Sequence, residues 1–416
     1  MPSNENALPI QPVRILVIGG CYGGLAAILA LLDLSRGRIA RFNFDKEAQA
    51  PTQSVPLAIT LVDERDGYYH LIGSPKALAS EEFADKTWTR FQDIPALQDS
   101  DITILQGSVT SVDCERKSAQ ILEAKADTPR ELPYDYLVAA SGLRRVFPTV
   151  PKSLLRDDFL AEAGAHAVSI RSAREGVVVV GGGAVGVEIA AELKELNPQQ
   201  KVTLVHSRDR LLSSEPLPDE LADRVATILR DADVDLVLGQ RVVETVPVES
   251  EGRTSFLLTL SDGSKLPAGH VISAISRSVP TTTYLPPQAL DEEGYVKIDA
   301  SLQFNSVPNA TYHFAAGDLV SWTGIKRCGA AIHMGHYAGT NIHQRIMQHA
   351  TGSEPKFSCL RKIPPMISIA LGHTAVSYTP DDGVKEGKEL LKIMFGDDMG
   401  YSICWNYMKL GDAPVY

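Results

Sequence analysis

Two segments of the chain share one pattern, and this internal repeat constrains the fold more than any other feature. Residues 13–34 read VRILVIGGCYGGLAAILALLDL, and residues 176–196 read GVVVVGGGAVGVEIAAELKEL. In each, a β-branched run of strand length leads into a glycine cluster and then into a helix-length stretch rich in small residues. Such a strand–turn–helix unit is typical of a dinucleotide-binding domain. The repeat therefore predicts an α/β protein with two Rossmann-type domains, called here the first and second units.

The glycine cluster of the second unit matches the whole fingerprint G-x-G-x-x-G, with Gly181, Gly183 and Gly186 at the glycine positions. The first glycine permits a tight turn, the second lets a pyrophosphate approach the backbone, and the third lets the helix pack on the strand. The phosphates then meet the free N–H groups at the helix N-terminus. The alternative is a glycine-rich packing turn without a ligand.

The glycine cluster of the first unit departs from the fingerprint at one position. It reads GGCYGG, so that Gly19, Gly20, Gly23 and Gly24 surround Cys21, which replaces the middle glycine. The cysteine side chain is small, and a tenfold change in affinity is only about 1.4 kcal/mol. Other contacts to the same cofactor can offset a loss of that size. We therefore expect the turn to keep its dinucleotide, and Cys21→Gly to tighten binding or change it little.

A carboxylate at the end of the second strand is expected to bind the ribose of a dinucleotide. Asp63 closes the run ITLVD and is the candidate in the first unit. It stands 39 residues after Gly24, further than the fingerprint expects, because an insert at 35–56 lengthens the connection. Glu64 is the alternative, since strand ends are uncertain by a residue or two in sequence-based prediction.

The second unit lacks this carboxylate. Twenty residues after Gly186 the chain reads His206-Ser207-Arg208. Without a carboxylate the 2′-phosphate of NADPH is not repelled, and Arg208 can pair with it. We therefore expect use of NADPH, or of both nicotinamide cofactors. The alternative is that Arg208 and Arg210 are simply solvated at the surface.

Charge and cysteine content limit the partners and the compartment. The 416-residue chain carries a net charge of −11, which disfavours nucleic-acid binding. The five cysteines form no C-x-x-C pair, which argues against a disulfide framework, a metal site of the zinc-ribbon type and a dithiol redox centre; they are Cys21, Cys114, Cys328, Cys359 and Cys404. Because the N-terminal sequence MPSNENALPI does not read as a signal peptide, we expect a cytoplasmic protein.

Two dinucleotide units without a C-x-x-C pair suggest a flavoprotein that takes hydride from a nicotinamide and passes electrons to something other than a disulfide. Six segments carry a family resemblance: VIGGCYGG, TLVDERDGYYHLIGSPKAL, DYLVAASG, VVVVGGGAVGVEIAAELK, KVTLVHS and YHFAAGDLV. With them the chain resembles the apoptosis-inducing-factor-like FAD oxidoreductases, and most closely their ferroptosis suppressor protein branch. That branch is related to the type II NADH:quinone dehydrogenases, within the pyridine nucleotide-disulfide oxidoreductase superfamily.

The resemblance implies FAD and NAD(P)H as cofactors and places several residues beside them. Asp318, preceded by Gly317, matches the aspartate that binds the ribityl chain of the flavin, and the helix that follows would point its N-terminus at the flavin ring. Three further positions match flavin contacts and one matches a nicotinamide contact; they are Lys76, Val109, Gly142 and, for the nicotinamide, Glu188. His70 and His333 either face the flavin region or are simply packed or surface residues.

The chain departs from the family pattern at four positions. Cys21 replaces a glycine, Ser276 stands where related chains have a glycine near the nicotinamide, and Asn406 stands where the branch has a lysine. Pro2 replaces the glycine that the branch lipidates. The resemblance therefore leaves peripheral membrane contact open.

We accordingly expect a glutathione-reductase-like arrangement. The FAD domain would comprise 10–147 and 280–352, the NAD(P)H domain 148–279, and a small α+β cap 353–416. The expected function is hydride transfer from NAD(P)H to flavin N5, followed by electron transfer to a quinone-like acceptor or to oxygen. The alternatives are a flavin-dependent oxidase or tailoring enzyme for a specific small molecule, and a degenerate relative with a signalling or binding role. No residue is assigned as an essential acid or base.

Overall fold

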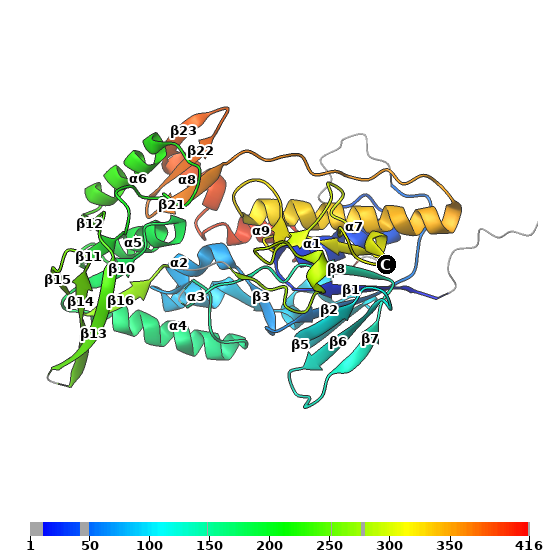
Figure 1. Cartoon of the computed structure of the whole chain (residues 1–416), viewed down its shortest axis with the longest axis horizontal. Coiled ribbons are helices and arrows are strands. Elements are labelled where there is room, and N and C mark those ends of the chain that lie inside the picture. Colours follow the sequence, from blue (N-terminus) through cyan, green and yellow to red (C-terminus); the bar gives the residue numbers. More distant parts are fainter. Residues whose placement is uncertain (1–10, 42–49, 148, 251, 276–278, 415–416) are drawn as a thin grey trace, which may run out of the picture.

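The computed structural model describes residues 11–41, 50–147, 149–250, 252–275 and 279–414. Pro2 and Ser276, singled out above, lie outside these ranges. Two α/β bodies occupy the two ends of an elongated molecule, and the C-terminal segment returns across both (Figure 1). The expected α/β fold with a parallel sheet in each unit is thereby confirmed. Within the described ranges, no helix combines the length and apolar character needed to cross a bilayer.

The first unit is built on a seven-stranded sheet with the strand order β19-β8-β1-β2-β5-β6-β7. The strands from β19 to β5 are parallel to their neighbours, and β5, β6 and β7 form an antiparallel meander that extends the sheet. Their bounds are β1 (Val13–Ile18), β2 (Leu57–Asp63), β5 (Ile102–Asp113), β6 (Ser118–Glu123), β7 (Arg130–Pro133), β8 (Tyr136–Ala139) and β19 (His313–Ala315).

Two helices pack closely on each other beside this sheet: α1 (Tyr22–Ser35) and α7 (Cys328–Thr351). Glycines make the close approach possible. A Cβ at Gly335 would collide with the carbonyl oxygen of Gly23, and one at Gly339 would lie 2.6 Å from that of Ala27. Because α1 follows β1 directly and is buried along nearly its whole length, this helix pair anchors the first turn.

The second unit contains a four-stranded parallel sheet with the order β12-β11-β10-β16 and a three-stranded antiparallel sheet, β13-β14-β15. Its strands are β10 (Val177–Val180), β11 (Val202–Val205), β12 (Val234–Val237), β13 (Val242–Ser250), β14 (Arg253–Leu260), β15 (Lys265–Ala268) and β16 (His270–Ser273). Its helices are α4 (Arg156–Arg171), α5 (Ala184–Leu196) and α6 (Asp219–Asp231). The consecutive valines of β10 are buried, as a central parallel strand requires.

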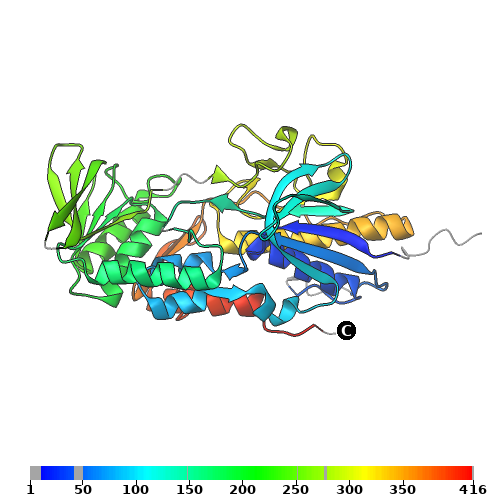
Figure 2. The same cartoon turned by 90° about the horizontal axis from the view of Figure 1, so that it is seen from below.

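The chain crosses between the two units where β9 (Leu143–Arg144) pairs with β17 (Val279–Pro280). The cap is the C-terminal antiparallel sheet together with two helices: β21 (Ile367–Leu371), β22 (Thr374–Thr379), β23 (Gly383–Gly387), α8 (Lys388–Phe395) and α9 (Tyr401–Tyr407). The sheet of the cap packs on α5 and α6 of the second unit, and the chain end runs back toward α1 (Figure 2).

Several shorter elements complete the described part of the chain. They are β3 (Gly67–Tyr69), β4 (Trp88–Arg90), α2 (Ser74–Ala77), α3 (Glu81–Thr87), β18 (Val296–Lys297) and β20 (Val320–Ser321). Single 3₁₀ turns occupy Leu71–Gly73, Phe91–Asp93, Pro95–Leu97, Pro287–Ala289 and Ala310–Tyr312.

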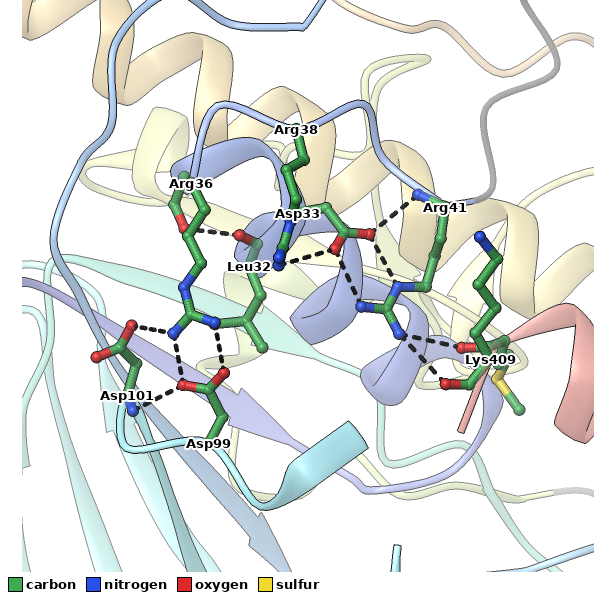
Figure 3. Close-up of polar contacts among 10 residues, drawn as sticks. Leu32, Asp33, Arg36, Arg38, Arg41, Asp99, Asp101 and Lys409 are labelled. Carbon is green, nitrogen blue, oxygen red and sulfur yellow. Dashed lines mark hydrogen bonds and ion pairs between the residues drawn. The ribbon is translucent and has the colours of Figure 1, made fainter. Parts of the chain in front are cut away.

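The far end of α1 is fixed by a cluster of ion pairs (Figure 3). Asp33, buried in the last turns of α1, accepts a hydrogen bond from Arg41 Nε at 2.8 Å. Arg36 pairs with Asp99 at 2.6 Å. Arg41 Nη1 also reaches the carbonyl oxygen of Lys409 at 3.4 Å, so the same cluster holds the C-terminal segment against the first unit.

Candidate dinucleotide sites

The two glycine turns have the same backbone geometry. Gly19 and Gly181, the first glycines, have φ angles of +104° and +119°, in the region that favours glycine. A Cβ on the last glycine of either turn, Gly24 or Gly186, would collide with the carbonyl oxygen of the first glycine. The internal repeat of the sequence is therefore also a repeat of turn structure, and both turns fit the close backbone approach that a dinucleotide requires.

Cys21 and Gly183 occupy the same place, immediately before the helix of their unit. Their φ angles are −106° and −79° with extended ψ angles, a conformation that any residue adopts. The Cys21 Sγ lies 3.5 Å from the carbonyl oxygen of Tyr69, to which it donates. Burial raises the pKa of this thiol to about 12. Cys21 thus brings neither backbone strain nor a negative charge to the turn.

The helix that follows each turn presents an N-terminus suited to an anion. In α1 and α5, both wholly among the described residues, no side chain caps the N-terminus and no acidic residue lies in the first turn. The helices have 14 and 13 residues, so their first N–H groups and their dipoles favour negative charge at this end. A pyrophosphate group fits both positions.

The strand-end residues predicted for ribose recognition contact the two turns in matching ways. The Gly20 N–H donates to Asp63 Oδ2 at 2.6 Å, and the Gly182 N–H donates to His206 Nδ1 at 3.1 Å. His206 therefore takes the position of the carboxylate in the second unit. Glu64, the alternative to Asp63, instead accepts a hydrogen bond from Ser108 at 3.0 Å.

His206 is held as a neutral ring by hydrogen bonds at both of its nitrogen atoms. Because Nδ1 accepts the Gly182 hydrogen bond, the proton of the neutral ring is on Nε2, which donates to Ser213 Oγ at 3.0 Å. Burial and the neighbouring Arg208 lower the pKa of His206. Arg208 is exposed and donates to the carbonyl oxygen of Ser213 at 2.5 Å. Arg210 differs, because it pairs with Asp219 at 2.6 Å.

The predicted ribityl ligand, Asp318, follows Gly317, whose φ angle is +88°. Arg145 pairs with Asp318 at 3.3 Å, and each side chain is about one-fifth exposed. Burial raises the pKa of Asp318, while Arg145 and Lys326 act in the opposite direction. A small cavity adjoins the aspartate and is lined in part by Lys326 and Arg327. Sequence reasoning missed Arg145, although it stands close to the predicted Gly142.

The predicted flavin contact Lys76 and the predicted nicotinamide contact Glu188 lie at the junction of α2, α5 and the cap. Lys76 Nζ is 3.7 Å from Oε2 of Glu192, a buried carboxylate that the sequence did not single out. Glu188 accepts a hydrogen bond from the N–H of Ala370 in β21 at 3.3 Å. Burial raises the pKa of Glu188 to about 8 and that of Glu192 to about 7.

His70 is completely buried in a polar cluster. Its Nδ1 lies 3.1 Å from the hydroxyl groups of both Tyr22 and Tyr68, and its Nε2 donates to the carbonyl oxygen of Met399 at 2.9 Å. Burial lowers the pKa of His70 to about 4, so the ring is neutral. The cluster links the start of α1 to the cap, which agrees with the packed alternative for this residue.

The remaining predicted residues are distributed around the first unit. Val109 lies on β5 where the register to β6 shifts, and Gly142, with φ of +71°, follows β8. His333 lies half-buried on α7, and Asn406 is exposed on α9. Across the described ranges, no three or more histidine, cysteine or acidic side chains come together in a way that could hold a metal ion.

Together these features fit FAD at the first turn. The turn excludes any side chain from Gly24, the start of α1 favours phosphate, and Asp63 and Asp318 offer carboxylates at two separate strand ends. Arginine and lysine side chains beside Asp318 keep that carboxylate from carrying an uncompensated buried charge. The second turn offers the matching arrangement for a second dinucleotide, with His206 in place of the carboxylate.

Comparison with known proteins agrees with this geometry. The family model described as pyridine nucleotide-disulphide oxidoreductase matches residues 13–335. Oxidoreductase OXR1 of Ajellomyces capsulatus is 52% identical and covers 100% of this chain and 92% of that protein. Ferroptosis suppressor protein 1 of Homo sapiens is 26% identical, with 95% and 96% covered.

A solved structure with the same fold is the sulfide:quinone oxidoreductase of Aquifex aeolicus. Its TM-score is 0.67 at 16% identity, covering 97% of this chain and 93% of that chain. The family match extends over both glycine turns and Asp318. The chain belongs to the pyridine nucleotide-disulphide oxidoreductase family, a family of NAD(P)H-dependent flavoprotein oxidoreductases.

Proposed function

We propose that this protein is an FAD-dependent NAD(P)H oxidoreductase that passes electrons to a quinone-like acceptor or to oxygen. The observation that carries the proposal is the pair of matching contacts, Gly20 to Asp63 and Gly182 to His206, each beneath a glycine turn and a helix N-terminus. When bound, the flavin supplies the redox chemistry, accepting hydride from the nicotinamide and delivering electrons to the acceptor. The protein supplies binding, orientation and charge.

In the first unit, the N-terminus of α1 would hold the FAD pyrophosphate and Asp63 the adenosine ribose. Asp318 would bind the ribityl chain, and its ion pair with Arg145 favours the ionised carboxylate and fixes its orientation. Lys76, Val109 and Gly142 stay predictions as flavin contacts.

In the second unit, the turn from Gly181 to Gly186 would hold the nicotinamide dinucleotide, with Glu188 on the nicotinamide side. We propose NADPH as the preferred donor. His206 is a neutral hydrogen-bond acceptor, so it does not repel a 2′-phosphate. Arg208 is exposed on the same segment and carries the positive charge that would bind it.

The cap supports an acceptor that reaches the protein from a membrane surface. Its helices α8 and α9 expose three large apolar side chains: Ile393 is 70%, Met394 45% and Ile403 40% exposed. Lys388 and Lys392 are exposed on α8 as well and would favour an anionic surface. Peripheral contact of this kind would present a lipid-dissolved quinone to the enzyme.

The test is a visible spectrum of the purified protein followed by anaerobic addition of NADPH. We expect a yellow protein whose flavin absorbance is bleached rapidly by NADPH. A flavoprotein that is not bleached by NADPH or NADH would instead be an oxidase or tailoring enzyme for another small molecule. A colourless protein that FAD cannot reconstitute would be a binding or signalling relative, and either result would overturn the proposal.

The acceptor is identified by a second experiment on the same preparation. NADPH oxidation is followed with oxygen alone and with a short-chain quinone, each with and without liposomes that contain anionic lipid. A quinone-dependent rate that liposomes increase supports the membrane-facing acceptor. An oxygen-dependent rate that neither quinone nor liposomes change assigns oxygen as the acceptor and removes the role proposed for the exposed face of the cap.

A further inference from the structure

One arginine beside the predicted ribityl ligand lacks a polar partner for its side chain. Arg327 directly precedes α7 and lines the same small cavity as Gly317 and Asp318. The side chain is partly buried, and its Nε atom is buried without a hydrogen-bond partner among the described residues. Burial lowers the pKa of Arg327, but a guanidinium stays protonated at neutral pH. The wall of the cavity therefore contains a positive charge that nothing in the described ranges pairs with.

The other two cations beside Asp318 are already engaged. Arg145 pairs with the carboxylate of Asp318 at 3.3 Å. Lys326 Nζ donates to the carbonyl oxygen of Val320 at 2.5 Å. Because one carboxylate cannot balance three cations and already has Arg145 as its partner, the charge of Arg327 is the one left for a ligand.

Arg345 on α7 provides a comparison, because its Nε atom is also buried without a partner. The Nη atoms of Arg345 donate to Gln303 and Gln348 at 2.9 Å, and its guanidinium carbon lies 4.6 Å from the centre of the Phe357 ring. These contacts hold Arg345 without any ligand. The described residues offer the Arg327 side chain neither kind of contact, so packing within the chain does not account for a charge at this position.

The backbone of Arg327 is fixed by the helix that it precedes. Its φ and ψ angles are −148° and 149°, and its carbonyl oxygen accepts a hydrogen bond from the N–H of Ala331 at 3.0 Å, in the first turn of α7. No acidic residue lies in that first turn, so the helix N-terminus adds positive potential of the same sign. A charge held in place in this way stabilises an opposite charge at little cost in reorganisation.

We propose that Arg327 binds the ring of the flavin and stabilises its reduced form. This inference rests on the proposed function, which puts the ribityl chain of FAD at Asp318. A guanidinium offers only hydrogen-bond donors, and the carbonyl oxygens and unprotonated nitrogens of the flavin ring are acceptors. Hydride transfer to the ring adds negative charge to these acceptors, and charge close to the ring nitrogens tunes the potential of a flavin. Arg327 would therefore bind reduced FAD more tightly than oxidised FAD and raise the midpoint potential.

The experiment compares midpoint potentials of the full-length, FAD-loaded protein and its variants by equilibrium titration against a reference dye. Arg327→Gln should weaken binding of reduced FAD, relative to oxidised FAD, by about ten- to hundredfold. A tenfold change lowers the potential of a two-electron couple by about 30 mV. Arg327→Lys keeps the positive charge and should retain most of the potential. Arg361→Gln is the matched control, because Arg361 is an exposed arginine two residues from the cavity-lining Ile363.

Three results would overturn the inference. The first is an unchanged potential in Arg327→Gln. The second is an equal loss of affinity for oxidised and reduced FAD, which would assign Arg327 to a part of the cofactor that reduction does not charge. The third is a changed KM for the electron acceptor at an unchanged potential, which would assign Arg327 to the acceptor. Failure of the proposed function is distinguishable, because the unaltered protein would then bind no FAD and show no flavin spectrum.

Discussion

The backbone N–H of Gly182 donates to Nδ1 of His206 at 3.1 Å, in the position where Gly20 donates to the carboxylate of Asp63 in the first unit. A neutral imidazole thus fulfils the structural task of the carboxylate, because it accepts the hydrogen bond that fixes the turn. It does so without the negative charge that disfavours a 2′-phosphate. The residue at this position can therefore fix the turn whether or not it carries the charge that decides between NADH and NADPH.

The first prediction concerns Arg208. Arg208→Ala should lower kcat/KM for NADPH by about ten- to hundredfold, because a hydrogen bond to a charged group contributes roughly 1.5–3 kcal/mol, and should leave NADH little changed. Steady-state kinetics with both cofactors measures the ratio. Arg210→Ala is the control, since Arg210 is already paired with Asp219. Equal effects of the two variants on the ratio would contradict the role of Arg208.

A second prediction follows from His206. His206→Asp would keep an acceptor near the Gly182 N–H but add a charge that repels the 2′-phosphate. We expect NADPH use to fall at least tenfold relative to NADH, measured as the ratio of kcat/KM values. His206→Asn keeps a neutral acceptor and should preserve the NADPH preference. A preference for NADPH that survives the aspartate would show that another group decides the specificity.

The third prediction tests the first unit. Asp63→Asn should weaken FAD binding by about tenfold or more, since a charged acceptor of hydrogen bonds is replaced by a neutral one. Titration of apoprotein with FAD, followed by flavin fluorescence, measures the affinity. Glu64→Gln serves as the control because Glu64 bonds to Ser108 and not to the turn. The assignment fails if the glutamate variant loses FAD and the aspartate variant does not.

The fourth prediction concerns Cys21. Cys21→Gly and Cys21→Ser should both retain FAD, with affinities within about tenfold of the unaltered protein, a difference of roughly 1.4 kcal/mol. The backbone conformation at this position requires no glycine, and the thiol is neutral. The same fluorescence titration applies. Loss of flavin in Cys21→Gly would reveal a specific role for the thiol.

The fifth prediction is a pH dependence of stability. Burial raises the pKa of Glu188 from 4.5 to about 8, so the folded protein binds a proton that the unfolded chain has released. This contribution is complete below pH 4.5 and is lost as the pH rises toward 8. Glu188→Gln should therefore gain stability relative to the unaltered protein between pH 5 and 8, by a few kcal/mol at about 1.4 kcal/mol per pKa unit.

Thermal unfolding of both proteins across this pH range measures the difference. Glu195→Gln is a suitable control, because Glu195 lies on the same helix but its side chain is 43% exposed. A difference between Glu188→Gln and the unaltered protein that stays constant with pH would mean that Glu188 is ionised in the folded state.

The fold was predictable because its evidence is local. Each strand, glycine turn and helix of the repeat lies within about twenty consecutive residues, and the steric demands on Gly24 and Gly186 are visible as glycines in the sequence. The sequence also predicted Asp63 as the strand-end carboxylate, because it closes an apolar run. The structure then places it, and not Glu64, against the turn. Its role in binding stays a prediction.

Contacts between distant segments were not predictable in this way. The pairing of Arg145 with Asp318 and that of Lys76 with Glu192 join residues from different elements, and no spacing in the sequence signals them.

The contact between α1 and α7 has a consequence for how tolerance to mutation should be interpreted. Gly335 and Gly339 touch the backbone of α1, so no larger residue fits there without separating the helices. The start of α1 and the start of α7 serve different parts of the proposed flavin site. A mutational scan would therefore score both glycines as intolerant, like ligand-binding positions, although neither would touch a ligand. They set the spacing between two ends of the proposed flavin site.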